Sequence, residues 1–121
     1  MSKPRILVTR QIFPEVIERL SQHFDVESNQ DDVLWSDAEL AERLKDKDGA
    51  LTTGTQPINA ALLAACPHLK IVSNMTVGYN NFDVNAMTAA GVQGTNTPDV
   101  LTETTADFGF ALLMATARRL T

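Results

Sequence analysis

Short apolar runs alternate along this chain with longer stretches in which apolar residues recur every three or four positions. The short runs, which are rich in β-branched residues, predict strands over residues 5–9, 24–28, 49–52, 69–73 and 92–95. The periodic stretches predict helices over residues 14–23, 36–44, 59–66, 83–90 and 104–120. Regular alternation of strands and helices is typical of a parallel sheet with helices on its faces. The pattern therefore predicts an α/β domain built on five parallel strands.

Residues that favour helix ends stand where the periodic stretches begin and stop. Ser36 is followed three positions later by Glu39, which is the spacing of a capping box. Asn59 and Asp83 are expected to cap the next two helices, and Gly91 is expected to end the second of these. These local signals support the element boundaries given above.

The last predicted helix is apolar on all sides. Between residues 106 and 117 its polar positions are only Asp107 and Thr116, and Asp99 or Thr102 is expected to cap it. A helix of this kind is normally buried on several sides, and the preceding elements can cover only one of them. We expect the helix to lack a partner surface within this chain, which stops at Thr121. The alternative is a terminal helix packed in a groove of its own domain.

Composition and charge limit the class of partner. The chain has 121 residues, a net charge of −5 and a pI of about 4.8, which argues against nucleic acids and anionic membrane surfaces as partners. An anionic substrate would need a local device to hold it, because the overall field repels it. No apolar run approaches the roughly 18 residues of a transmembrane helix. With one cysteine, Cys66, and no signal peptide, we expect a cytoplasmic protein.

Ligands of open parallel sheets bind at the carboxyl ends of the strands, where three loops are expected. These are residues 52–57, 75–83 and 96–98. In the second loop Gly78 permits a positive φ and close approach by a ligand, and consecutive backbone N–H groups there could hold an anion. The alternative is a plain turn in which Asn80 and Asn81 satisfy backbone groups.

Other polar residues carry weaker functional signals. His23 is expected at a helix end and His68 in a solvated connection, whereas Cys66 is expected to be a buried, inert thiol. Trp35 is expected to pack on the helix that follows it, and the Asp31–Asp32 pair to lie in a solvated loop. The sequence has no metal-ligand spacing, no phosphate-binding P-loop and no dinucleotide fingerprint.

Three stretches give the chain a family resemblance. Residues 69–84, LKIVSNMTVGYNNFDV, resemble the signature of the D-specific 2-hydroxyacid dehydrogenases. They are most similar to the branch of glyoxylate, hydroxypyruvate and 2-ketogluconate reductases. Residues 96–107 and 111–119 resemble the start and the body of that family's interdomain helix.

The resemblance implies a two-domain enzyme with its active site in the cleft between the domains. The outer, substrate-binding domain is flavodoxin-like, with strand order 2-1-3-4-5, and would comprise residues 1–100 here. Residues 101–121 would be the interdomain helix that leads into an NAD(P)-binding domain. By the same resemblance Val77 and Gly78 would bind the substrate carboxylate, Thr53 and Gly54 would line the same cleft, and Thr105 would lie against the cofactor near its nicotinamide half.

The resemblance also implies that the catalytic groups are missing. The family's catalytic histidine, its assisting carboxylate and its anion-binding arginine lie in later segments, so no residue of this chain matches them. We therefore expect a substrate-domain part of an NAD- or NADP-dependent reductase of small 2-keto acids that is inactive alone. We also expect a homodimer or a helix-swapped oligomer formed through residues 108–120.

A stand-alone α/β module that binds carboxylates or regulates a partner is the alternative. A receiver-type signalling domain is excluded, because the first and third predicted strands do not end in the aspartate that such a domain requires.

Overall fold

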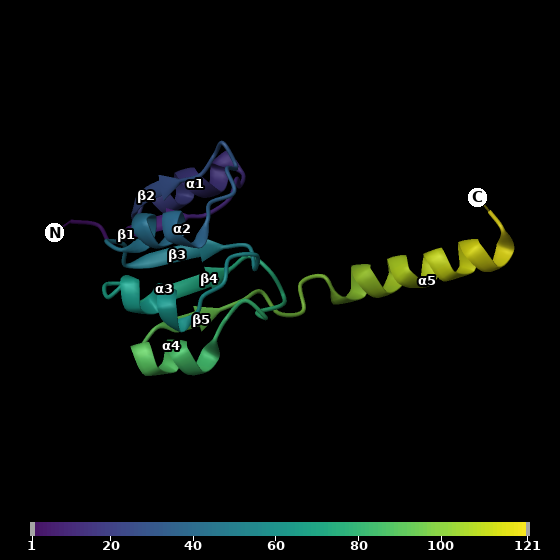
Figure 1. The fold of residues 1–121 in the computed structure, drawn as a ribbon. Coiled ribbons are helices and arrows are strands. Elements are labelled where there is room, and N and C mark those ends of the chain that lie inside the picture. The colour runs from purple at the N-terminus through teal and green to yellow at the C-terminus, as the bar shows by residue number, and fades with distance from the viewer. Residues whose placement is uncertain (1, 121) are drawn as a thin grey trace.

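Five parallel strands form one sheet in the computed structural model of the chain, which describes residues 2–120 (Figure 1). The strands are β1 (Arg5–Val8), β2 (Asp25–Ser28), β3 (Gly49–Thr52), β4 (Ile71–Asn74) and β5 (Gln93–Thr95). Their order is β2-β1-β3-β4-β5, and each neighbouring pair is parallel. This order is the flavodoxin-like arrangement that the family resemblance implies, so the predicted fold class is confirmed.

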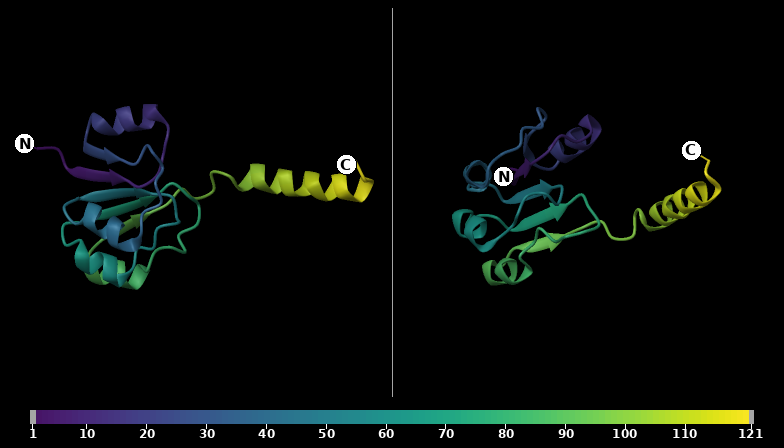
Figure 2. Two further views of the ribbon diagram at one scale, coloured as in Figure 1. Left: turned by 45° about the horizontal axis from the view of Figure 1, so that its top comes forward. Right: turned by 45° about the vertical axis from the view of Figure 1, so that its right-hand side comes forward.

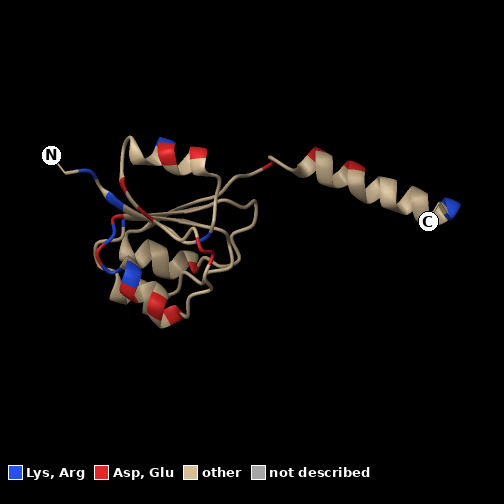
Figure 3. Ribbon diagram, turned by 90° about the horizontal axis from the view of Figure 1, so that it is seen from above, with Lys and Arg blue, Asp and Glu red and all other residues tan. Residues whose placement is uncertain are grey.

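Helices cover the two faces of the sheet unequally. They are α1 (Pro14–Ser21), α2 (Asp37–Leu44), α3 (Ala60–Ala65), α4 (Val84–Ala90) and α5 (Thr102–Arg118). Seen along the sheet in Figure 3, α1 lies on one side of the strands, and the other helices of the domain lie on the opposite side. The layer formed by α2, α3 and α4 is therefore the main cover of the sheet (Figure 2).

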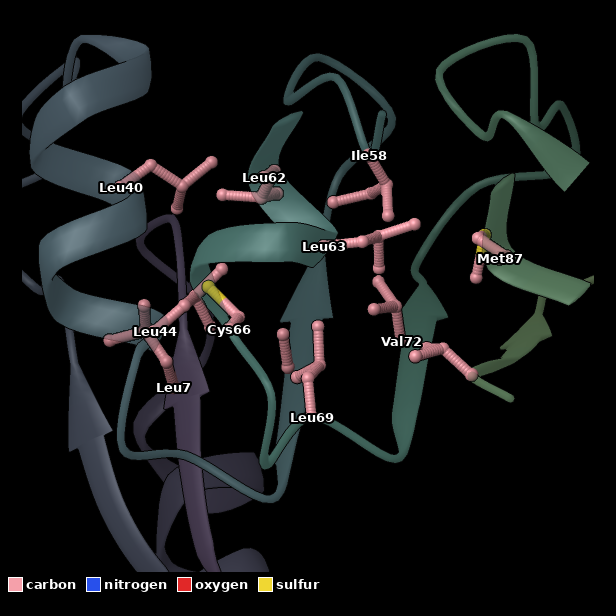
Figure 4. Close-up of a cluster of buried hydrophobic side chains, with 12 residues drawn as sticks. Leu7, Leu40, Leu44, Ile58, Leu62, Leu63, Cys66, Leu69, Val72 and Met87 are labelled. Atoms are coloured by element: carbon pink, nitrogen blue, oxygen red, sulfur yellow. The ribbon is translucent and has the colours of Figure 1, made fainter. Parts of the chain in front are cut away.

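The hydrophobic core lies between the sheet and this layer (Figure 4). It is built from Leu7, Leu40, Leu44, Ala50, Ile58, Leu62, Leu63, Cys66, Leu69, Val72, Met87 and Val92. Burying one leucine of this kind stabilises a fold by roughly 1.5–3 kcal/mol. Cys66 is part of the core as expected, and burial raises the pKa of its thiol.

The opposite face of the sheet is only partly covered. No residue of α1 is fully buried, and Val16 in α1 and Ile71 in β4 remain 39% and 38% exposed. The apolar stripe predicted for this helix is therefore only half-buried, at Ile17 and Leu20. A helix that packs alone on one side of a sheet leaves the neighbouring strands open.

The local capping signals act as predicted. The Ser36 hydroxyl accepts from the backbone N–H of Glu39, and the Glu39 carboxylate accepts from the backbone N–H of Ser36 at 2.8 Å. Asn59 and Asp83 cap α3 and α4. Gly91 ends α4 in the left-handed region, with φ 70°.

Most strand and helix boundaries differ from the sequence prediction by one or two residues, including those at the starts of β4 and α5. β4 begins at Ile71 rather than at residue 69, because the N–H of Leu69 donates to the carbonyl of Cys66 in a turn. α5 begins at Thr102, with Leu101 in the N-cap position and no side-chain cap. The predicted caps, Asp99 and Thr102, were therefore wrong.

α5 extends away from the rest of the domain (Figures 1 and 2). It has no buried residue, and Phe108, Phe110 and Leu113 are each more than 60% exposed. Figure 3 shows almost no charge along the body of the helix. Within residues 2–120 this apolar helix has no partner surface, as its sequence predicts.

Candidate carboxylate site

Three loops meet at the carboxyl edge of the sheet, as the parallel topology predicts. The loop after β4 is joined to β3 by the N–H of Met75, which donates to the carbonyl of Thr52 at 2.8 Å. It is joined to the loop after β5 by the N–H of Thr97, which donates to the carbonyl of Thr76 at 3.0 Å. Residues 52–57, 75–83 and 96–98 therefore form one connected surface.

The Val77–Gly78 segment belongs to this surface. Its backbone carbonyls have hydrogen-bond partners in the protein, whereas its backbone N–H groups do not. The Val77 carbonyl accepts from Asn96 Nδ2 at 2.8 Å, and the Gly78 carbonyl accepts from Thr76 Oγ1 at 2.8 Å. No atom among residues 2–120 accepts from the backbone N–H of Val77 or of Gly78. The two carbonyls are thus occupied by the protein, whereas the N–H groups of Val77 and Gly78, like those of the other residues in 76–81, have no acceptor among residues 2–120.

Gly78 contributes open space rather than an unusual backbone conformation. The glycines with positive φ among residues 2–120 are Gly54 and Gly91, so Gly78 does not use the positive φ that a glycine permits. A Cβ atom built on Gly78 would have no heavy atom within 4 Å. The expected close approach of a ligand therefore remains available, without an anion nest that depends on a left-handed glycine.

Gly54 and Thr53 lie in the adjacent loop, as predicted. Gly54 has φ 79°, and a Cβ atom there would lie 3.1 Å from Thr76 Oγ1 in the loop after β4. The two loops pack this closely because position 54 has no side chain. Thr53 is half-buried, and its N–H donates to Gln56 Oε1 at 3.4 Å. The structure therefore brings Thr53 and Gly54 to the loop that contains Val77 and Gly78.

Thr105 is not brought to this surface. It lies in the first turns of α5, where its N–H donates to the Leu101 carbonyl at 2.9 Å, and its side chain is exposed. Because α5 extends away from the sheet, the fifth predicted site residue is separated from the other four (Figure 1).

A buried amide network beneath the loops was missed by sequence reasoning. Asn74, the last residue of β4, is 2% exposed and donates to Asn81 Oδ1 at 2.8 Å and to the Gly78 carbonyl at 3.3 Å. It also accepts from Thr52 Oγ1, and Asn81 Nδ2 donates to the Gln56 carbonyl at 2.9 Å. The available signal was a polar residue two positions after Val72, on the core-facing side of an otherwise buried strand.

Among residues 52–57, 75–83 and 96–98 the one Asp, Glu, His, Lys or Arg is Asp83, and its carboxylate caps α4 by accepting from the Ala86 N–H. No other side chain of these types is present there to transfer a proton. His23 and His68 precede β2 and β4, which places them at the opposite edge of the parallel sheet. Both are exposed, and neither was predicted to be catalytic. The surface can bind an anion through backbone dipoles, but it contains no general acid.

Arg10, at the carboxyl end of β1, is not free to bind a ligand anion. Its guanidinium holds both carboxylate oxygens of Asp32, at 2.6 and 2.8 Å. This pairing corrects the expectation that Asp32 lies in a plain solvated loop. The hydrogen bond from Arg10, followed by one from the backbone N–H of Gln11, holds the pKa of the Asp32 carboxyl well below its usual range.

An apolar hollow of about 560 Å³ opens next to the candidate carboxylate site. Met75, in the loop after β4, lines it together with Phe13 and Val16, which lie at the start of α1. Phe13 is 77% exposed. This hollow belongs to the incompletely covered face of the sheet.

The glycine-rich turn that is typical of a nicotinamide dinucleotide site is missing from the described residues. Such a site needs a glycine-rich turn between a strand and a helix, and the turns after β1, β3 and β4 lack that pattern. Thr105, the residue predicted to contact the cofactor, contributes a single exposed hydroxyl. Within residues 2–120 no cluster of His, Cys, Asp and Glu could hold a metal ion, and none of the helices is long and apolar enough to cross a membrane.

The sequence profile of the D-isomer specific 2-hydroxyacid dehydrogenase catalytic domain matches residues 6–119. A glyoxylate reductase of Korarchaeum cryptofilum is 47% identical over 117 residues, which is 97% of this chain and 35% of that protein. A glyoxylate reductase of Thermococcus onnurineus is 47% identical over 118 residues, which is 98% of this chain and 35% of that protein. The chain thus spans about a third of the length of these reductases.

Solved structures agree with the sequence relatives. An NADPH-dependent glyoxylate/hydroxypyruvate reductase of Sinorhizobium meliloti, in complex with NADP and malonate, matches with a TM-score of 0.73 and 38% identity. The match covers 95% of this chain and 34% of that one. A 2-hydroxyacid dehydrogenase of Ketogulonicigenium vulgare matches with a TM-score of 0.76 and 36% identity over 99% of this chain and 37% of that one. The profile match and these relatives show that the chain belongs to the D-isomer specific 2-hydroxyacid dehydrogenase family.

Proposed function

We propose that this chain is the N-terminal substrate-domain part of a longer NAD(P)-dependent 2-hydroxyacid dehydrogenase that reduces small 2-keto acids. Glyoxylate, hydroxypyruvate and 2-ketogluconate are the substrates proposed. The observation that carries the proposal is the Val77–Gly78 segment, with two free backbone donors and open space at the glycine. It lies within the stretch matched by the family profile.

The role of this chain in the reaction is to bind and orient. The N–H groups of Val77 and Gly78 would hold the carboxylate of the 2-keto acid, and Thr53 and Gly54 would border the same cleft. Neutral backbone donors suit this task in a protein of net charge −5, because they attract an anion locally. The nicotinamide cofactor would supply the hydride, and the general acid would come from residues outside this chain.

The placement of α5 supports a division of the chain into two parts. We propose that residues 1–100 form the substrate-binding domain and that residues 101–121 form an interdomain helix, with Thr105 near the cofactor. The apolar sides of α5 would be covered by a cofactor domain and by a second copy of the protein, giving a homodimer. This arrangement accounts for a helix with no buried residue in the isolated chain. We place the enzyme in the cytoplasm.

The alternative is a stand-alone carboxylate-binding or regulatory module. Such a module would need a polar outer surface on α5, whereas Phe110, Leu113 and Met114 are exposed there. The exposed helix therefore favours the dehydrogenase.

The proposal is tested on the polypeptide isolated from its source. We expect an intact mass well above the 13.2 kDa of these residues and oxidation of NADH or NADPH in the presence of glyoxylate or hydroxypyruvate. The 121-residue chain, assayed in parallel, should show no turnover. A native mass of 13.2 kDa, or turnover by the short chain, would contradict the proposed division of labour.

A further inference from the structure

The candidate carboxylate site is held by a side chain that does not itself border the open surface. Asn74 is 2% exposed at the end of β4, and its amide group donates to both the Gly78 carbonyl and Asn81 Oδ1. Among the residues that the structure describes, it is the one that connects β4 to two points within the loop, Gly78 and Asn81.

The same carboxamide joins the loop after β4 to the loop after β3. Its oxygen accepts from Thr52 Oγ1 and from Asn81 Nδ2, the latter at 3.3 Å. Asn81 in turn donates to the Gln56 carbonyl, and its own carbonyl accepts from the N–H of Ile58 at 2.8 Å. A fully satisfied buried amide network of this kind fixes one arrangement of the segments that it connects.

We propose that Asn74 is a positioning residue for substrate binding. Its Nδ2 donates to the Gly78 carbonyl and so holds the neighbouring backbone N–H groups in one orientation, in which they can bind a carboxylate. The inference rests on the proposed function, since it names what orients that same site. Without Asn74 the Gly78 peptide loses one of its two side-chain partners, and Asn81 loses its link to β4. The loop then samples orientations in which the two donors do not converge on one anion.

Asn29 offers a matched control at another loop. It is 5% exposed, and its Nδ2 also donates to two acceptors, the carbonyls of Thr9 at 3.0 Å and Val33 at 2.8 Å. It braces the loop after β2, which contains none of the predicted site residues. Replacing either asparagine by leucine removes the amide hydrogen bonds at similar side-chain size and without adding charge.

The experiment compares Asn74→Leu and Asn29→Leu in the complete enzyme. For Asn74→Leu we expect KM for the 2-keto acid to rise by about tenfold or more while kcat changes much less. We also expect faster deuterium exchange in the peptide that spans residues 75–83, and loss of the protection that malonate gives to this peptide. Asn29→Leu should accelerate exchange around residues 29–35 and leave KM unchanged.

The outcomes separate this inference from the proposed function. If the wild-type enzyme reduces no 2-keto acid, the proposed function fails, and exchange with and without malonate still shows whether Asn74 orders an anion-binding loop. If Asn74→Leu does not fold, Asn81→Ala tests the same link from a half-buried position and should also raise KM. Unchanged exchange over residues 75–83, or a KM change equal to that of Asn29→Leu, would overturn the positioning role.

Discussion

At the scale of single residues, the candidate site depends on the absence of a side chain at position 78. The Gly78 backbone has no left-handed conformation that would require glycine, and a Cβ atom would meet no neighbour. Folding alone therefore does not demand glycine here. Under the proposed function, glycine is needed here because a ligand must closely approach the N–H groups of Val77 and Gly78.

Enlarging residue 78 should consequently weaken substrate binding and leave stability nearly unchanged. We expect Gly78→Ala to raise KM for the 2-keto acid modestly and Gly78→Val to raise it by about tenfold or more, because each added methyl group fills the approach to the donors. Steady-state kinetics of the complete enzyme measure the effect, and thermal unfolding provides the stability control. Unchanged kinetics in the valine variant would remove this segment from the site.

The Arg10–Asp32 ion pair connects the loops after β1 and β2 and should make stability depend on acid. The pKa of Asp32 is depressed in the folded protein, so its contribution is fully present above the unfolded value of about 4. That contribution is lost as pH falls below this value toward the folded pKa. Asp32 has φ 53°, a conformation that asparagine also tolerates, so Asp32→Asn removes the charge at little backbone cost.

We expect the wild-type protein to melt at a higher temperature than Asp32→Asn near neutral pH, and the difference to shrink between about pH 4 and pH 2. Asp31→Asn is the control, because Asp31 forms no ion pair among the described residues. Thermal melts of the three proteins across this range provide the measurement. A difference that stays constant with pH would show that the pair contributes nothing through ionisation.

At the scale of secondary structure, α2 has the most complete helix start in the chain. Ser36 and Glu39 exchange hydrogen bonds between side chain and backbone, which satisfies two N–H groups that the helix itself leaves unpaired. Ser36→Ala should destabilise the fold by about 1 kcal/mol. The control is Ser21→Ala, since the one hydrogen bond of the Ser21 hydroxyl is to the Ile17 carbonyl within α1. Chemical denaturation measures both, and equal small losses would contradict a specific role for the capping box.

The capping residues also show which parts of the structure could be predicted from the sequence. Ser36, Asn59 and Gly91 act within a few residues of themselves, so local pattern was sufficient to place the ends of their helices. Asn74 was missed because its partners, Gly78, Asn81 and Thr52, come together only when β3 and β4 pair. The same limit explains Asp32, because its partner Arg10 lies in a different loop, after β1.

At the scale of the whole molecule, two apolar surfaces remain open. One is the face of the sheet beside α1, where Phe13, Val16 and Met75 line a hollow. The other is α5, which has 17 residues and extends for about 25 Å away from the domain. Exposed apolar patches of this extent are typical of surfaces that other protein covers.

The isolated chain should therefore self-associate through α5. Covering one large apolar side chain contributes roughly 1.5–3 kcal/mol, whereas association costs about 4–15 kcal/mol in lost freedom, so several residues must be covered together. Phe108 and Leu112 lie on one stripe of the helix and Leu113 on the next, and all three are more than 50% exposed. We expect sedimentation velocity of the 121-residue chain to show a concentration-dependent dimer or larger species, and Phe108→Glu with Leu112→Glu to yield monomers. Thr116→Glu, which adds a charge at a position that is already polar, should associate as the wild type does. A wild-type chain that stays monomeric at high concentration would show that α5 can remain uncovered in water, and the proposed second copy would then lose its main support.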